Sequence, residues 1–169
     1  MTIRLETPRL RLEPLSPSHA DALYAIYREP EVRRFLITCP SNRAEFERIF
    51  EHALRFEATH GMWAIVDPAL PATIGRVGFF AFGEHARPEI AFLLSQRFWG
   101  RGLATEAAAA SLAFGFSRHG WVEVIGIVRP MNDPAIRVLA KLGMRREREI
   151  VLGSAPAIVY RVGSGEVVA

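Results

Sequence analysis

A glycine- and arginine-rich segment near the middle of the chain carries residue types that bind phosphate groups. It reads Gln96-Arg97-Phe98-Trp99-Gly100-Arg101-Gly102-Leu103-Ala104-Thr105-Glu106-Ala107. Glycine has no Cβ, so the main chain at Gly100 and Gly102 can approach an anion closely and take unusual φ and ψ angles. Arg97 and Arg101 add positive charge beside the backbone N–H donors. The segment therefore predicts a loop that binds a phosphate or pyrophosphate group.

The sequence on either side predicts the elements that position this loop. An apolar run at residues 90–94 indicates a strand, and residues 103–117 are rich in alanine, which has the highest helix propensity. A strand, a glycine loop and a helix start in this order bring unpaired N–H groups and the positive end of the helix dipole together. The predicted site is thus the N-terminus of that helix.

Two other kinds of phosphate loop fit the segment less well. A Walker A loop ends in Gly-Lys followed by Ser or Thr, and the only lysine of the chain is Lys141. The dinucleotide fingerprint G-x-G-x-x-G is matched at Gly100 and Gly102, but Thr105 stands at the third glycine. Glu123 follows at about the interval of a ribose-binding acid, yet it lies near the start of an apolar run, whereas that acid belongs at a strand's end. A nicotinamide-nucleotide enzyme is the weaker alternative.

The segment resembles the acyl-CoA signature of the GNAT N-acetyltransferase superfamily, Q/R-x-x-G-x-G/A, which it matches as Arg97-x-x-Gly100-x-Gly102. The longer string at residues 99–107 is similar to the form in the branch that includes the ribosomal-protein N-terminal alanine and serine acetyltransferases. Residues 7–12, 63–66, 74–78 and 132–144 resemble further parts of that branch. The resemblance implies one acetyltransferase domain over residues 1–169, with acetyl-CoA as co-substrate and a primary amine as acceptor.

The resemblance also implies which residues bind acetyl-CoA. The backbone of residues 97–104 would hold the pyrophosphate, and backbone N–H groups of residues 92–94 would polarise the thioester carbonyl, although the sequence leaves the donor open. Asn132 would contact the CoA arm, unless it is only a turn residue before the next helix. For Glu106, at the helix start, a capping or packing role is favoured over a catalytic one. The implied set is Phe92, Leu93, Leu94, Arg97, Trp99, Gly100, Arg101, Gly102, Leu103, Ala104, Thr105 and Asn132.

Glu89 is the implied general base. In the family, a glutamate at the start of this strand borders the acceptor site. A protonated amine cannot attack a thioester, so a nearby carboxylate can accept the proton, directly or through water. The alternative is a strand-edge carboxylate paired with Arg87 or another arginine, and both interpretations stay open. His85, in a predicted loop, is a weaker candidate for the base.

The usual proton donor to the leaving thiolate is missing. Many GNAT enzymes carry a tyrosine on the fourth helix, where this chain has Leu139, and others a serine near its start, where it has Ala135. Water can suffice, because a thiolate is a fairly good leaving group. The gap keeps open a second hypothesis, a non-catalytic acyl-CoA-binding or sensing module. The acceptor stays open between a protein N-terminus and a small amine such as an aminoglycoside, a polyamine or an amino acid, and the family favours a homodimer.

Length and composition exclude several classes of protein. The chain has 169 residues, half of them hydrophobic, which indicates one domain of ordinary globular composition. The net charge is +3, and no basic run with interleaved aromatic residues predicts a nucleic-acid partner. No apolar run has the length of a membrane span, and the N-terminus lacks a signal peptide's apolar core. Cys39 is the only cysteine, and no cluster of ligands indicates a metal. We therefore expect a cytoplasmic protein.

Periodicity and turn residues predict an α/β (α+β) fold, with a mixed, mostly antiparallel sheet of about six or seven strands and about four helices. Asn42 is the predicted N-cap of the second helix, with Glu45 completing a capping box. Asp133 is the predicted N-cap of the fourth, with Pro134 at its first position. The GNAT resemblance implies that the sheet splays between its fourth and fifth strands, where the pantetheine arm lies. The predicted strands are residues 10–15, 62–67, 73–82, 89–94, 122–128, 145–152 and 157–162, and the helices are 16–27, 42–58, 103–117 and 133–143.

Overall fold

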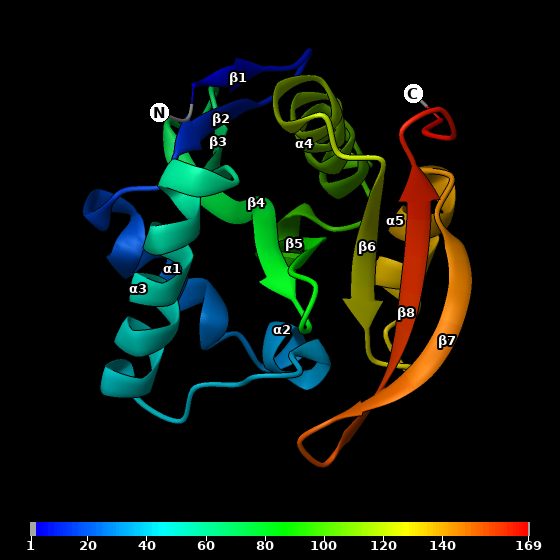
Figure 1. Ribbon diagram of the computed structural model, residues 1–169. Coiled ribbons are helices and arrows are strands. Elements are labelled where there is room, and N and C mark those ends of the chain that lie inside the picture. The colour runs from blue at the N-terminus through cyan, green and yellow to red at the C-terminus, as the bar shows by residue number, and fades with distance from the viewer. Residues whose placement is uncertain (1–2, 169) are drawn as a thin grey trace.

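The computed structural model describes residues 3–168 and confirms an α+β fold built on one mixed sheet (Figure 1). The strand order is β1-β2-β3-β4-β5-β6-β8-β7, and every neighbouring pair except β5 and β6 is antiparallel. The predicted number of strands was one too low, because β1 is too short to leave a periodic pattern. The strands are β1 (Leu5–Glu6), β2 (Arg11–Pro14), β3 (Met62–Asp67), β4 (Ala72–Phe82), β5 (Arg87–Leu94), β6 (Glu123–Val128), β7 (Arg145–Leu152) and β8 (Ala155–Gly163).

The described residues form five α-helices, one more than the sequence predicted. The additional helix is α2, which begins at Pro30 and is too short to show an apolar period. Two 3₁₀ turns, Pro17–His19 and Gln96–Phe98, precede α1 and the glycine loop. Within residues 3–168, no helix is both long and apolar enough to cross a bilayer. The helices are α1 (Ala20–Tyr27), α2 (Pro30–Phe35), α3 (Arg43–Thr59), α4 (Leu103–His119) and α5 (Asp133–Lys141).

Side-chain caps fix the starts of two helices. Asn42 caps α3 as predicted, because its side chain accepts a hydrogen bond of 2.9 Å from the backbone N–H of Glu45. The predicted capping box does not form, because the Glu45 carboxylate accepts from the backbone N–H of Ser41, at 2.7 Å, and not from that of Asn42. The prediction for α5 was wrong by one residue. Asn132 is its N-cap, with Oδ1 3.1 Å from the Ala135 nitrogen, and Asp133 is the first helical residue. Asn and Asp are both favourable N-cap residues, so the sequence does not show which of the two caps the helix. The non-helical backbone conformation at Asn132 identifies it as the N-cap.

The sheet is buried on both faces, as β3 illustrates. Trp63 and Ile65 pack in the cluster that includes α4 and α5, while Met62 and Ala64 pack in the cluster that includes α1 and α3. Side chains alternate along a strand, so neighbouring residues of one apolar run serve two different cores. Figure 1 shows α1 and α3 on one side of the sheet, away from α4 and α5.

The parallel contact between β5 and β6 is very short. Only two residue pairs are in register, Glu89 with Ile125 and Ile90 with Gly126. Beyond Ile90, β5 stays paired with β4 as far as Leu94, but it no longer pairs with β6. In Figure 1, β6 stands apart from β4 and β5. This divergence matches the splay expected between the predicted fourth and fifth strands, and it leaves one edge of β5 open.

An ion-pair cluster joins the strands at the closed end of the splay. Arg87, at the start of β5, lies 2.7 Å from a carboxylate oxygen of Glu123 on β6. Its Nη1 and Nη2 also donate to Glu147 on β7, at 3.1 and 2.9 Å. One guanidinium therefore links three strands. Glu123, which the dinucleotide alternative would assign to a ribose, is instead a partner of Arg87.

A second charged group connects the start of α4 to the segment before β2. Glu106 Oε1 accepts hydrogen bonds from the Thr7 hydroxyl at 2.6 Å and the Arg9 backbone N–H at 2.9 Å, and Oε2 accepts one from Arg9 Nε at 2.6 Å. Burial by itself would raise the pKa of Glu106, because it disfavours the charged form. The three hydrogen bonds have the larger effect and hold the pKa below its ordinary value. The packing role favoured for Glu106 is the role that these contacts support.

We predict that Glu106→Ala lowers the free energy of unfolding at neutral pH by about 2 kcal/mol, because three hydrogen bonds to a charged acceptor are lost. The folded-state pKa is depressed, so the contribution of Glu106 is present above its ordinary value of 4.5 and is lost as the pH falls through the folded-state value. Urea denaturation at pH 7 and in acid measures this. Glu84→Ala, in an exposed loop, is the control. A change within about 0.5 kcal/mol for Glu106→Ala at pH 7 would contradict the prediction.

Candidate active site

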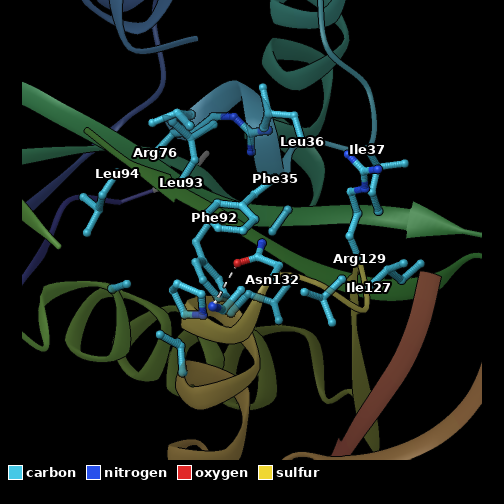
Figure 2. Close-up of a pocket in the computed structure, with 18 of the residues that line it drawn as sticks. Phe35, Leu36, Ile37, Arg76, Phe92, Leu93, Leu94, Ile127, Arg129 and Asn132 are labelled. Atoms are coloured by element: carbon cyan, nitrogen blue, oxygen red, sulfur yellow. Dashed lines mark hydrogen bonds between the residues drawn. The ribbon is translucent and has the colours of Figure 1, made fainter. Parts of the chain in front are cut away.

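A cavity of about 870 Å³ lies along the divergence of β5 and β6. Its walls come from α2 and the segment after it, α3, β4, β5, the start of α4, the end of β6 and α5. Figure 2 shows Arg76 and Arg129 reaching toward Phe35, Leu36 and Ile37, with Asn132 on the opposite side. The cavity thus joins the glycine loop to the face of the sheet that carries Glu89.

The glycine loop ends in a helix start that exposes N–H donors. Gly100 and Gly102 have φ of 74° and 76°, a left-handed conformation that favours glycine. Gly102 is the N-cap of α4, and no side chain in the described part of the protein caps this end. An α-helix leaves its first N–H groups without intrahelical partners, so those of Leu103, Ala104 and Thr105 can bind an anion, aided by the helix dipole.

Most of the residues predicted to bind acetyl-CoA line the cavity, but two do not. Arg97 and Arg101 are exposed, and their guanidinium groups lie 4.8 and 5.5 Å from the centre of the Phe98 ring. They flank the loop on its solvent side. The predicted residues that line the cavity are Phe92, Leu93, Leu94, Trp99, Gly100, Gly102, Leu103, Ala104, Thr105 and Asn132.

The register of β5 decides which of its N–H groups face the cavity. The Ser95 N–H donates to Ile74 of β4 at 2.9 Å, and bonded and non-bonded residues alternate along an antiparallel strand. The N–H of Leu93 therefore points to β4, whereas those of Phe92 and Leu94 point to the open edge. The Leu94 carbonyl on that edge accepts a hydrogen bond of 2.9 Å from Trp99 Nε1. This is the donor choice that the sequence left open.

Glu89 lines the cavity without a hydrogen-bonded partner in residues 3–168. Its sequence neighbour Arg87 is engaged by Glu123 and Glu147, so the pairing considered from the sequence does not form. Burial raises the pKa of Glu89 to about 7, while the positive charge of Arg76 acts in the opposite direction. A carboxyl group with a pKa near neutrality can hold or release a proton at physiological pH.

Two buried or half-buried cationic residues of the cavity, Arg76 and Arg129, were missed from the sequence. Arg76 is 9% exposed, and its Nε and Nη2 donate to the Tyr27 hydroxyl at 3.1 and 2.8 Å. Arg129, after β6, donates to the Arg34 carbonyl, and its Nε is buried without a partner among the described residues. The available signal was an arginine inside the apolar run of β4. Predicting a strand there does not show what the arginine side chain contacts.

The α5 side of the cavity has the Asn132 amide, but it has no hydroxyl at positions 135 and 139, where members of the GNAT superfamily carry a serine or a tyrosine. The Asn132 oxygen is used by the helix cap, which leaves its NH₂ group free to donate. Asn132 therefore serves as a cap and can also contact a ligand. Ala135 and Leu139 line the cavity as well, and neither side chain can give a proton to a leaving group.

This geometry combines an uncapped helix start, an open strand edge and a buried carboxyl group in one cavity, and comparison with known proteins identifies the class of protein. Residues 9–145 match the family model described as "Acetyltransferase (GNAT) domain". The chain belongs to the GNAT acetyltransferase family, and it is an N-acetyltransferase.

The relatives cover nearly all of the chain. The uncharacterised N-acetyltransferase YoaA of Bacillus subtilis (strain 168) is 29% identical over 147 residues, which are 85% of this chain and 83% of YoaA. The crystal structure of a GNAT-family acetyltransferase from Bacillus anthracis superposes with a TM-score of 0.82 at 19% identity, covering 97% of this chain and 100% of the other. The ribosomal-protein-S5-alanine acetyltransferase of Vibrio fischeri gives 0.77 at 14% identity, covering 99% and 100%. The two structures support the fold.

We predict that Glu89 titrates with a midpoint near pH 7, measured by ¹³C NMR of labelled glutamate side chains. The folded-state pKa is raised above its ordinary value of 4.5, so a stabilising contribution present in acid is lost as the pH rises through 7. Glu89→Gln should therefore gain about 1–3 kcal/mol of stability over the wild type above pH 7, and nothing near pH 4. Arg76→Gln should raise the midpoint further. A midpoint near 4.5 would contradict the prediction.

Proposed function

We propose that the protein transfers the acetyl group of acetyl-CoA to a primary amine by direct attack in a ternary complex, with Glu89 as the general base. One observation carries the proposal: the N–H donors of the α4 start, the open edge of β5 and Glu89 all border one cavity. Acetyl-CoA carries a pyrophosphate at one end, which the N–H donors of α4 would bind. Its thioester at the other end would then lie at the open edge of β5, beside Glu89.

The start of α4 would bind the pyrophosphate. The N–H groups of Leu103, Ala104 and Thr105 are supported by the helix dipole, and Gly100 and Gly102 keep side chains out of the way. Arg97 and Arg101 add positive charge from the solvent side. Asn132 would hold the CoA arm through its free NH₂ group, because its oxygen is engaged in the cap.

The acyl transfer itself would take place at the open edge of β5. Glu89 accepts a proton from the ammonium group of the acceptor, which frees the nitrogen lone pair to attack the thioester carbon. The N–H groups of Phe92 and Leu94 are preorganised donors for the oxyanion that develops. The C–S bond then breaks and the thiolate leaves as CoA. One of the two protons still on the nitrogen passes to solvent or to the thiolate, and the other stays as the amide N–H. Leu139 and Ala135 supply no protein acid for this step.

We predict that acetyl-CoA raises the melting temperature, whereas NADH and ATP do not. A ligand at about a hundredfold over its Kd adds roughly 2.7 kcal/mol, which for a domain of this size is a shift on the order of 5–10 °C. Gly102→Val should abolish the shift, because a β-branched side chain is strained at a φ of 76° and would distort the N-cap of α4, from which the N–H donors project. Gly83→Val, at a φ of 72° outside the cavity, is the matched control and should keep the shift. A larger shift with NADH would refute the assignment of the loop.

We predict that Glu89→Gln lowers kcat/KM by about 10²–10⁴-fold, the usual contribution of a general base. Free CoA thiol, released in the presence of a panel of amines, is the measurement. In the wild type, kcat/KM should rise with pH to a plateau above an apparent pKa near 7, because the carboxylate must be ionised to accept a proton. Glu84→Gln, in an exposed loop, should leave kcat/KM unchanged. Full activity of Glu89→Gln would remove Glu89 from the mechanism, and binding without turnover of any amine would favour a sensing module.

A further inference from the structure

Arg76 is a buried cation without a carboxylate partner. It is 9% exposed, and no carboxylate among the described residues lies within ion-pairing distance of it. Two of its N–H groups donate to the Tyr27 hydroxyl, and Nη1 donates to the sulfur of Met62, at 3.9 Å. The guanidinium also lies 5.4 Å from the centre of the Phe80 ring. A guanidinium has five N–H donors, and burying one without a counter-ion is costly. Each nitrogen of the guanidinium has a neutral partner, but none has a carboxylate within ion-pairing distance among the described residues, so the site can accept an anion.

Tyr27 adds a second donor at the same place. Its side chain is buried, and its hydroxyl oxygen accepts both hydrogen bonds from Arg76. The hydroxyl proton has no acceptor in the part of the chain that the structure describes. Tyr27 and Arg76 both line the cavity, so one incoming anion could accept from both. Nε and Nη2 already donate to the Tyr27 oxygen, so a carboxylate would accept from the Tyr27 hydroxyl with one oxygen and from a second N–H of Nη2 or Nη1 with the other.

The register of β4 and β5 places this donor pair on the same face of the sheet as Glu89. Arg76 pairs with Leu93 and Phe80 pairs with Glu89, and alternate residues of a strand share a face. The cavity thus presents a negative group and a positive group along one face. The remaining wall beside them is apolar and aromatic, with Phe35, Phe80 and Trp99.

The other charges of the cavity disfavour a polycationic acceptor. Among residues 3–168, four further cationic side chains line it, and the only acid besides Glu89 is Glu45, which accepts two hydrogen bonds from Ser41. A polyamine or an aminoglycoside would bring several positive charges into this field. The further cationic residues are Arg48, Arg129, Arg137 and Lys141.

We propose that the acceptor is a small apolar amine that also bears a carboxylate, an amino-acid-like zwitterion. Its carboxylate would bind Arg76 and the Tyr27 hydroxyl, and its ammonium group would face Glu89. The inference rests on the proposed function for the role of Glu89, but the anion site stands on Arg76 and Tyr27 alone.

The test separates binding of the carboxylate from turnover. Calorimetry of the full chain, with and without acetyl-CoA, compares 3-phenylpropionate with its uncharged amide, 3-phenylpropanamide. We expect the acid to bind at least tenfold more tightly than the amide. Arg76→Gln and Tyr27→Phe should each remove that preference, and Tyr27→Phe keeps the ring that packs in the core. Arg55→Gln, on the exposed side of α3, is the matched control and should keep the preference.

Turnover is then measured with L-phenylalanine, L-phenylalaninamide and 2-phenylethylamine, with spermidine as the polycation. We expect L-phenylalanine to have the highest kcat/KM, and Arg76→Gln to lower the ratio of the acid to the amide by about tenfold to a hundredfold. Equal binding of the two probes, or binding of neither up to about 10 mM, would overturn the anion site.

The failures of the two proposals can be told apart. If the acid binds through Arg76 but no amine releases CoA, the proposed function fails and the anion site stands. If 2-phenylethylamine or spermidine is acetylated better than L-phenylalanine, the proposed function stands and the zwitterionic acceptor is overturned. If both variants fold, as judged by their melting curves, and retain the preference for the acid, Arg76 and Tyr27 have only a packing role.

Discussion

The divergence of β5 and β6 is the constraint on which the rest of this molecule depends. A strand inside a sheet normally pairs along both edges, because buried N–H and C=O groups without partners are costly. Here β5 keeps its full ladder with β4 but only two registered pairs with β6. The strand is therefore held rigidly on one side and left open on the other. The glycine loop and α4 follow directly from its end, so the open edge and the uncapped start of α4 come from one continuous segment.

The distribution of charge follows from this geometry. Arg87 is taken by two carboxylates at the closed end of the splay, which leaves Glu89, two residues further along, without an arginine partner. Burial then acts on an unpaired carboxyl group and raises its pKa to about 7. Arg76 approaches from the next strand, yet it is held by a tyrosine hydroxyl and not by an acid. If every charged group were paired, neither a carboxyl group with a raised pKa nor a guanidinium without an acidic partner would be available in the cavity.

Much of this arrangement was predictable, and the misses share a cause. The loop, its two special glycines, the Asn42 cap and the order of strands and helices follow from local patterns, because φ preferences, capping and periodicity act over a few residues. The missed elements, β1 and α2, are too short to show a period. The α5 cap was misplaced by one residue because Asn132 and Asp133 have similar capping propensities. The anchoring of Glu106 by Thr7 and Arg9 joins residues nearly a hundred positions apart, which no local pattern reports.

The sequence by itself determined the glycine- and arginine-rich segment, the family and the identity of the residue at each position of the site, including Glu89, Leu139 and Ala135. Only the tertiary structure decided which charges meet. Whether Glu89 pairs with Arg87 depends on where Glu123 and Glu147 lie, and those residues reach Arg87 from two other strands. The choice of Phe92 and Leu94 over Leu93 as edge donors depends on the register with β4. Burial and electrostatic pairing are properties of the space around a side chain, and that space is built by residues distant in sequence.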